Sequence, residues 1–350
     1  MKTVARVELR PGMTLGEDVI WQDKVIFGAG TVLSQLQIDR LKRYSVTLVT
    51  VMEDVDFATT HYEKLRFSQT FRTFELMHAQ SLMAYKGLMH DFNNKVAPVP
   101  DQELLYIYNE MRATYTNCTQ LLDYLYNLMP NEDELTYNHC LNSALLVGFL
   151  AEWMDMPKDD QMDLILSGFY YDIGKLHLPY ELLWSSEKLT PEEYTLVKNH
   201  PTIGWDMLKG THISQDILDA VLMHHERMDG SGYPQQLQGD KISIFARYLA
   251  IVDTYIAMAS PRPHRDALTP LEIIETLDQD KHKYDTDLLT PFIKHIADAQ
   301  VGASVKLNDE SVWDILTINP NRFSRPILSN RAQEVLDLME HPELEIVKMV

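Results

Sequence analysis

Residues 224–234 read His-His-Glu-Arg-Met-Asp-Gly-Ser-Gly-Tyr-Pro, the most distinctive stretch of the chain. Its glycines and proline mark a turn. The adjacent histidines are ambiguous alone, because neighbouring side chains on a helix point about 100° apart. Imidazoles combined with carboxylates suit borderline divalent ions such as iron, manganese or zinc. The stretch therefore indicates a metal site if suitable carboxylates accompany it.

Two aspartates stand at the ends of apolar helical runs on either side of this stretch. Asp172 follows the largely apolar residues 164–171, and Asp253 follows the apolar residues 249–252. A carboxylate in such a place is costly to bury unless it is paired or bound to a cation. Taken singly, each such residue also has an ordinary explanation as a helix cap or a satisfied core group. The candidate metal ligands are His139, Asp172, His200, His224, His225 and Asp253.

The composition is that of a globular chain with an acidic surface. Of the 350 residues, 45% are apolar and 23% are charged, which excludes a disordered chain. The formal net charge of −20 opposes binding to nucleic acid duplexes and to anionic membranes. An anionic ligand therefore needs a local positive site, made by metal ions or by clustered Arg and Lys.

The sequence also predicts a cytoplasmic location. Cys118 and Cys140 are too few for a disulfide framework, which fits a reducing compartment. The first 12 residues lack the apolar core of a signal peptide. No run of about 18 apolar residues suggests a membrane span. We therefore expect no membrane partner.

The two ends of the chain have a mixed or strand-rich character. Residues 1–54 predict a small N-terminal α/β unit, with a helix capped by Ser34 and a strand over residues 47–51. Residues 301–350 predict a small β-rich C-terminal appendage, because short strand-like runs alternate with turn residues.

Residues 55–128 predict a helical connector. Phe67, Phe71 and Phe74 share one helix face, which indicates core packing, with a dimerising helix as the alternative. Asp101 follows a Pro-rich break and is expected to cap a helix that continues to about residue 128.

The remaining segment, residues 129–300, predicts helix after helix. Thr190 and Thr269 each begin a capping box with Pro at the first helical position. The expected fold is therefore mainly α, a helical bundle flanked by the two smaller parts.

Several short motifs surround the candidate ligands in a fixed order. They are Tyr171-Asp172-Ile173-Gly174-Lys175, His200-Pro201-x-x-Gly204, residues 224–234, Ala246-Arg247, Val252-Asp253-Thr254-Tyr255 and Ser260-x-Arg262-Pro263. Their order and spacing resemble the HD-GYP family, a branch of the HD phosphohydrolases, over about residues 130–300. The resemblance implies an all-α HD-type bundle. Members hydrolyse the bacterial messenger cyclic di-GMP to pGpG and often GMP, with iron or manganese.

The resemblance also implies a role for each matching residue. It assigns the six candidate ligands to the metal centre, with Asp172 bridging two ions. Lys175 would lie near the scissile phosphate, and Arg262 would hold a substrate phosphate. Tyr233 would belong to a loop beside the catalytic pocket. The residues alone leave an alternative for each of these three. Lys175 could be a solvated surface lysine, Arg262 could form a surface ion pair, and Tyr233 could belong to a structural turn.

Several positions depart from the family pattern, among them Ala259 in place of a usual Thr and His264 in place of a common Tyr, and three more bear on the metal centre. Tyr171 stands where the family has the histidine of its His-Asp pair, and a phenol ligates poorly until it ionises. Ile256 replaces a usual Asp, and Leu135 replaces a Glu that supports a third ion in some members. We therefore expect one complete and one weak or altered site, holding one or two divalent ions.

Two functions of different classes follow. The first is a metal-dependent phosphodiesterase that hydrolyses cyclic di-GMP in bacterial second-messenger signalling. The alternative is a degenerate, non-catalytic domain that binds cyclic di-GMP or a protein and acts as an effector. Lys175 and the intact loop favour the enzyme, whereas Tyr171 and Ile256 favour the alternative. A homodimer and a diguanylate cyclase or other signalling protein are candidate partners.

Overall fold

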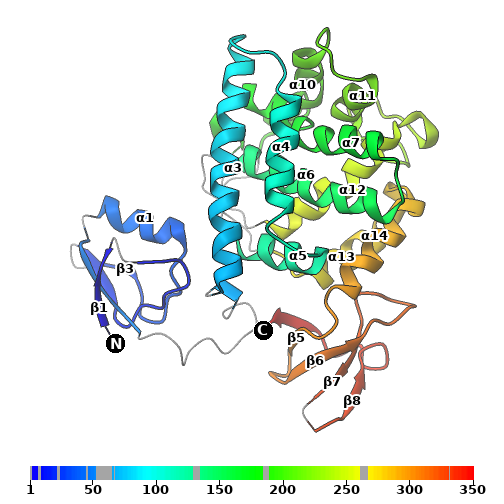
Figure 1. Cartoon of the computed structure of the whole chain (residues 1–350). Coiled ribbons are helices and arrows are strands. Elements are labelled where there is room, and N and C mark those ends of the chain that lie inside the picture. Colours follow the sequence, from blue (N-terminus) through cyan, green and yellow to red (C-terminus); the bar gives the residue numbers. More distant parts are fainter. Residues whose placement is uncertain are drawn as a thin grey trace.

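The structure, a computed structural model, is mainly helical, as predicted (Figure 1). It describes residues 2–6, 9–21, 24–44, 46–52, 65–66, 68–128, 135–183, 189–260, 267–330 and 332–350. Within these ranges, no helix has both the length and the apolar character needed to cross a bilayer. The domain boundaries at residues 54, 128 and 300 stay predictions.

The N-terminal unit has a small core of its own. Its elements are β1 (Lys2–Ala5), β2 (Val19–Trp21), β3 (Lys24–Phe27), α1 (Gln35–Arg43) and β4 (Leu48–Val51). Strand β1 pairs antiparallel with β4, and β2 pairs antiparallel with β3. Helix α1 begins after Ser34, whose side chain accepts a hydrogen bond from the Gln37 backbone N–H. Leu15, Leu33 and Leu41 fill the core.

The connector contains α3 (Gln69–Asn93), α4 (Asp101–Arg112) and α5 (Cys118–Asn127). The single helix expected from Asp101 to residue 128 is wrong, because Asn117 caps a new helix by accepting from the Gln120 N–H. Asp101 is the first helical residue and not the cap. Phe71 and Phe74 are buried, whereas Phe67 lies outside the described residues.

Helix α6 lies at the centre of the bundle (Figure 1). Its residues 140–151 are all buried, which is typical of a helix covered on every side. Residues Thr190 and Thr269 form the expected capping boxes. The bundle consists of α6 (Leu135–Trp153), α7 (Lys158–Tyr170), η3 (Ile173–His177), α8 (Tyr180–Leu183), α9 (Pro191–Val197), α10 (His200–Leu208), α11 (Gln215–Met223), η4 (Gly239–Lys241), α12 (Ile244–Ala259), α13 (Pro270–Gln279), η5 (Lys281–Lys283) and α14 (Thr286–Asp298).

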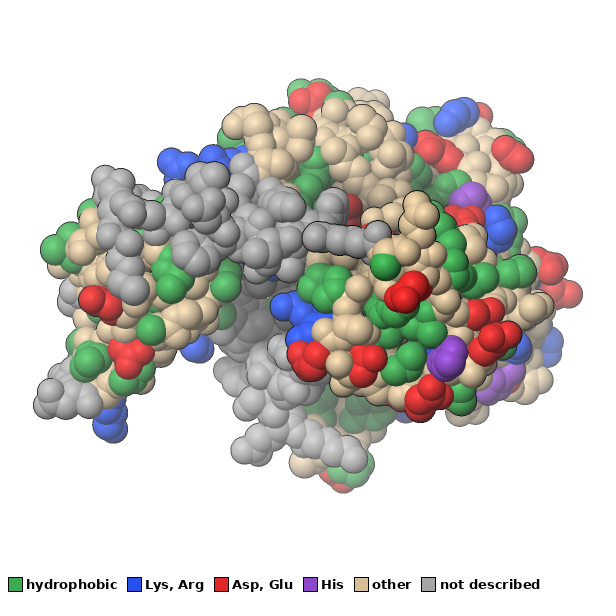
Figure 2. All heavy atoms as spheres, turned by 90° about the horizontal axis from the view of Figure 1, so that it is seen from below, with side chains coloured by type: hydrophobic (Ala, Val, Ile, Leu, Met, Phe, Trp, Pro, Cys, Tyr) green, Lys and Arg blue, Asp and Glu red, His purple; other side chains and the backbone are tan. Residues whose placement is uncertain are grey.

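The C-terminal part is an antiparallel five-stranded sheet of order β8-β7-β6-β5-β9, as its β-rich sequence predicts. Its strands are β5 (Ser304–Leu307), β6 (Val312–Thr317), β7 (Ile327–Ser329), β8 (Val335–Asp337) and β9 (Ile346–Met349). Val305 and Leu307 belong to the same buried core as the helices. Figure 2 views the molecule from this end and shows acidic side chains spread over the surface.

Candidate metal centre

Asp172 occupies the junction between α7 and η3, where the chain packs tightly on α10. A Cβ atom at Gly174 would lie 2.0 Å from the carbonyl oxygen of His200. Only glycine permits this approach, which brings the fully buried Asp172 next to His200. The spacing of the Asp-Ile-Gly-Lys motif is therefore explained by backbone packing.

The histidines His200 and His224 are oriented by backbone carbonyl groups. The Nδ1 atom of His200 lies 2.7 Å from the oxygen of Val197. The Nδ1 atom of His224 lies 2.8 Å from the oxygen of Val221. A carbonyl only accepts, so each Nδ1 carries a proton, and in the neutral form each ring points an Nε2 lone pair inward. Such outer partners are typical of metal-ligating histidines.

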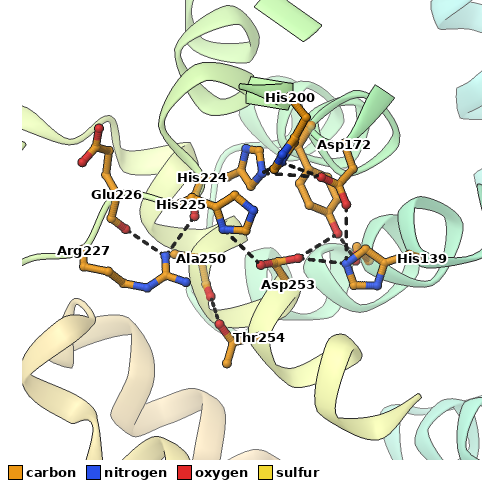
Figure 3. Close-up of polar contacts among 12 residues, drawn as sticks. His139, Asp172, His200, His224, His225, Glu226, Arg227, Ala250, Asp253 and Thr254 are labelled. Carbon is orange, nitrogen blue, oxygen red and sulfur yellow. Dashed lines mark hydrogen bonds and ion pairs between the residues drawn. The ribbon is translucent and has the colours of Figure 1, made fainter. Parts of the chain in front are cut away.

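Three acceptor atoms meet at the centre of this group (Figure 3). The two Nε2 atoms of His200 and His224 lie 3.1 Å apart. The Oδ1 atom of Asp172 lies 3.1 Å from the first and 3.6 Å from the second, and it is buried with no hydrogen-bond donor among the described residues. Ligands on one ion at bond lengths of about 2.1 Å lie roughly 3.0–3.5 Å apart. This group, with His225, therefore fits a divalent cation.

A second group lies on the other side of the Asp172 carboxylate and consists of His139, Asp172 and Asp253. The Nε2 atom of His139 is 2.8 Å from Asp253 Oδ1 and 3.8 Å from Asp172 Oδ2. The hydroxyl of Tyr171 faces this group. It lies 3.4 Å from Asp253 Oδ1 and 2.9 Å from the hydroxyl of Ser143.

The protonation states follow from burial and nearby charge. Burial raises the pKa of Tyr171 well above its usual value, and the charges of Asp253 and Asp172 raise it further, so the phenol stays neutral. Burial would also raise the pKa of Asp172, but the Lys175 charge and the histidines outweigh it and the carboxylate stays ionised. Burial lowers the pKa of His225 well below its usual value, which favours the neutral ligand form.

Lys175 lies at the edge of a pocket that opens beside the second group. Its Nζ atom contacts Asp172 Oδ2, and the side chain is partly exposed. The pocket is lined by Leu135, Thr136, Asn138, His139, Asp172, Lys175, Leu182, Leu183, Leu189, Val197 and Ser260. An anion that enters this pocket therefore meets Lys175 together with the candidate metal ligands His139 and Asp172.

The loop after His225 is fastened by a buried carboxylate. Glu226 accepts hydrogen bonds from the backbone N–H groups of Gln235, at 2.6 Å, and Leu237, at 2.9 Å. A Cβ atom at Gly232 would lie 2.5 Å from backbone atoms of residues 225–227. These contacts place the ring of Tyr233 4.6 Å from the ring of His225, centroid to centroid.

Comparison with known proteins agrees with this geometry. Residues 123–288 match the family described as HD domain. A cyclic di-GMP phosphodiesterase of Pseudomonas aeruginosa, PA4108, is 34% identical over 206 residues, which cover 59% of this chain and 49% of that protein. Residues 123–288 thus match the HD domain family, and relatives named cyclic di-GMP phosphodiesterases support the resemblance to its HD-GYP branch.

Other relatives of this domain carry similar names. The cyclic di-GMP phosphodiesterase response regulator RpfG of Xanthomonas campestris is 32% identical, over 48% of this chain and 44% of that protein. The chain spans about half or less of the curated relatives it matches first. A solved structure, Bd1817, a HDG"Y"P protein from Bdellovibrio bacteriovorus, matches 84% of this chain and 99% of that one, at TM-score 0.47 and 16% identity.

The structure brings all six candidate ligands together, with Lys175 and Tyr233 beside them. Arg262 lies outside the described residues. Sequence reasoning missed the roles of Glu226 and Ser143. Glu226 stood inside the quoted motif, but nothing in the sequence marks Ser143 as the partner of a tyrosine 28 residues away.

Proposed function

We propose that this chain is a metal-dependent phosphodiesterase that hydrolyses cyclic di-GMP to pGpG, GMP or both, in bacterial second-messenger signalling. The main support is the buried group of acceptor atoms around Asp172 Oδ1, which has no donor of its own and fits a divalent cation. Relatives with this domain that are named cyclic di-GMP phosphodiesterases point to the substrate.

The residues near the pocket would bind the metal ions and the substrate phosphate. Bound divalent ions would activate water and neutralise phosphodiester oxygens. Asp172 and the four histidines His139, His200, His224 and His225, with Asp253, would supply the ligands. Lys175 would hold the reacting phosphate, since its ammonium group lies beside Asp172 at the pocket edge. Its charge counters the net −20 of the chain at the place where an anionic substrate enters.

We propose specific roles for the residues of the site, and a metal, a location and a partner for the protein. Asp172 and Lys175 are the catalytic residues, and Lys175, Tyr233 and Arg262 bind the substrate. Iron or manganese is the metal, because both suit mixed imidazole and carboxylate ligands. We also propose a cytoplasmic location and a partner among signalling proteins, such as a diguanylate cyclase.

The experiment is a substrate panel. The purified full chain is incubated with cyclic di-GMP or 3'3'-cGAMP, each with ferrous iron or manganese, and products are separated by chromatography. We expect pGpG or GMP from cyclic di-GMP, and no product from the Asp172→Ala variant. Intact cyclic di-GMP under both metals, from folded protein, would contradict the proposal. Tight binding of the uncleaved dinucleotide would then favour the effector function.

A further inference from the structure

The two halves of the candidate metal centre differ in how their polar atoms are satisfied. In the first half, the Nδ1 atoms of His200 and His224 face backbone carbonyl groups, so their Nε2 atoms and the Oδ1 atom of Asp172 are left as potential hydrogen-bond acceptors. They lie 3.1–3.6 Å apart, and when both rings carry a proton on Nδ1 alone, none of the three atoms donates to another. Three acceptors at this spacing repel one another unless a cation lies between them.

The second half is complete without a cation. A proton on Nε2 of His139 makes a 2.8 Å hydrogen bond to Asp253 Oδ1. The Tyr171 hydroxyl donates toward the same oxygen at 3.4 Å. The Ser143 hydroxyl, 2.9 Å away, can in turn donate to the Tyr171 oxygen. Each donor in this series of hydrogen bonds therefore has an acceptor. The Tyr171 oxygen already accepts from Ser143, so it has no need of a cation.

We propose that the chain binds one metal ion tightly, held by Asp172, His200, His224 and His225, and that Tyr171 keeps His139 and Asp253 as a hydrogen-bonded pair. The inference rests on the metal-dependent function proposed above and specifies its metal content. Tyr171 is then a positioning residue: it contacts Asp253 and makes no bond to the ion.

This arrangement gives opposite expectations for two substitutions at one position. Tyr171→Phe removes the hydroxyl contact to Asp253 but no ligand, so the tightly held ion remains. Tyr171→His replaces a donor with an imidazole that can present a lone pair beside Asp172 and Asp253. The second group then gains a fourth ligand and binds an ion of its own.

The test counts ions and does not depend on turnover. The full chain is stripped with a chelator and titrated with Mn²⁺ by calorimetry, and bound manganese per chain is measured by mass spectrometry after dialysis. We expect one ion in the natural protein, in Tyr171→Phe and in His139→Ala. We expect none in His224→Ala and two in Tyr171→His. In the natural protein any second ion should bind at least about 10-fold more weakly.

Two results would overturn the inference. One is two ions of similar affinity in the natural protein, with one lost in His139→Ala. The other is a visible phenolate charge-transfer band after ferric loading that is absent from Tyr171→Phe, since that band would make Tyr171 a ligand. Circular dichroism checks that each variant folds. If Tyr171→His does not fold, the natural protein and His139→Ala still decide the question.

The outcome is separable from that of the proposed function. A protein that holds one manganese and leaves every dinucleotide intact contradicts the proposed reaction and supports the one-ion site. A protein that cleaves cyclic di-GMP with two equally tight ions does the reverse.

Discussion

At the scale of single residues, the candidate site depends on where protons and lone pairs lie. The sequence predicts its six ligand-type residues because histidines and aspartates are unusual in apolar helical runs. It does not predict which half of the site lacks donors, since that depends on carbonyl groups such as Val197 and Val221. Ile256 is buried, as expected of an apolar residue, but its effect on the metal stays a prediction.

Glu226 should stabilise the loop after His225, because it accepts two backbone hydrogen bonds there. Glu226→Ala leaves the backbone N–H groups of Gln235 and Leu237 without their shared acceptor. We expect the free energy of unfolding to fall by about 2–4 kcal/mol, because hydrogen bonds to a buried carboxylate are strong. Urea denaturation measures this change. Glu110→Ala, on the exposed face of α4, is the control and should change it by less than about 0.5 kcal/mol. Equal effects would contradict the fastening role.

At the scale of elements, local signals predicted the helix starts well. The capping boxes at Thr190 and Thr269 occur as expected, because each uses only residues within one turn. The break between α4 and α5 was missed, although Asn117 is a good cap residue. The signal was present in residues 112–119, Arg-Ala-Thr-Tyr-Thr-Asn-Cys-Thr, because threonine and asparagine are weak helix formers.

Two glycines in different helices should respond oppositely to alanine. At Gly148 in α6, a Cβ atom would lie 2.2 Å from the hydroxyl oxygen of Tyr108 on α4, whereas nothing lies within 4 Å at Gly87 in α3. We expect Gly148→Ala to lower the melting temperature through helix displacement. Gly87→Ala should raise stability by about 0.5–1 kcal/mol, because alanine favours a helix interior. Calorimetry measures both, and the same sign in both variants would contradict this packing.

At the scale of the whole molecule, the residues that the structure describes form two cores. The N-terminal unit has one, and the helices share the other with the C-terminal sheet. The sheet's β-rich character could be predicted from its sequence, but its share in the helical core could not, because the contacts join segments far apart. Glu275 on α13 links the helices to the C-terminal sheet region, because its carboxylate accepts hydrogen bonds from Arg322 and Ser324, which lie between β6 and β7.

The attachment of the sheet should weaken in acid. Burial tends to raise the pKa of Glu275, but the hydrogen bond from Arg322 outweighs it and lowers the pKa below the usual 4.5. The ionised carboxylate is therefore favoured in the folded state, so its stabilisation is present above pH 4.5 and is lost as the pH falls further. The melting temperature of the natural protein should exceed that of Glu275→Gln at pH 6.

This difference should shrink as the pH falls from about 4.5 toward 3. Arg322→Gln removes the same contact and is the matched comparison, so its difference from the natural protein should shrink over the same range. A difference that grows in acid would contradict the role of the ionised carboxylate.

We propose that the candidate metal ligands around Asp172 make this domain a metal-dependent phosphodiesterase. The most direct measurement follows cleavage of cyclic di-GMP while chelator-stripped full chain is titrated with Mn²⁺, beside Asp172→Ala under the same conditions. We expect the stripped protein to leave cyclic di-GMP intact and to cleave it once Mn²⁺ is added. Asp172→Ala should not cleave it at any metal concentration. Cleavage by the stripped protein, or by Asp172→Ala, would contradict it.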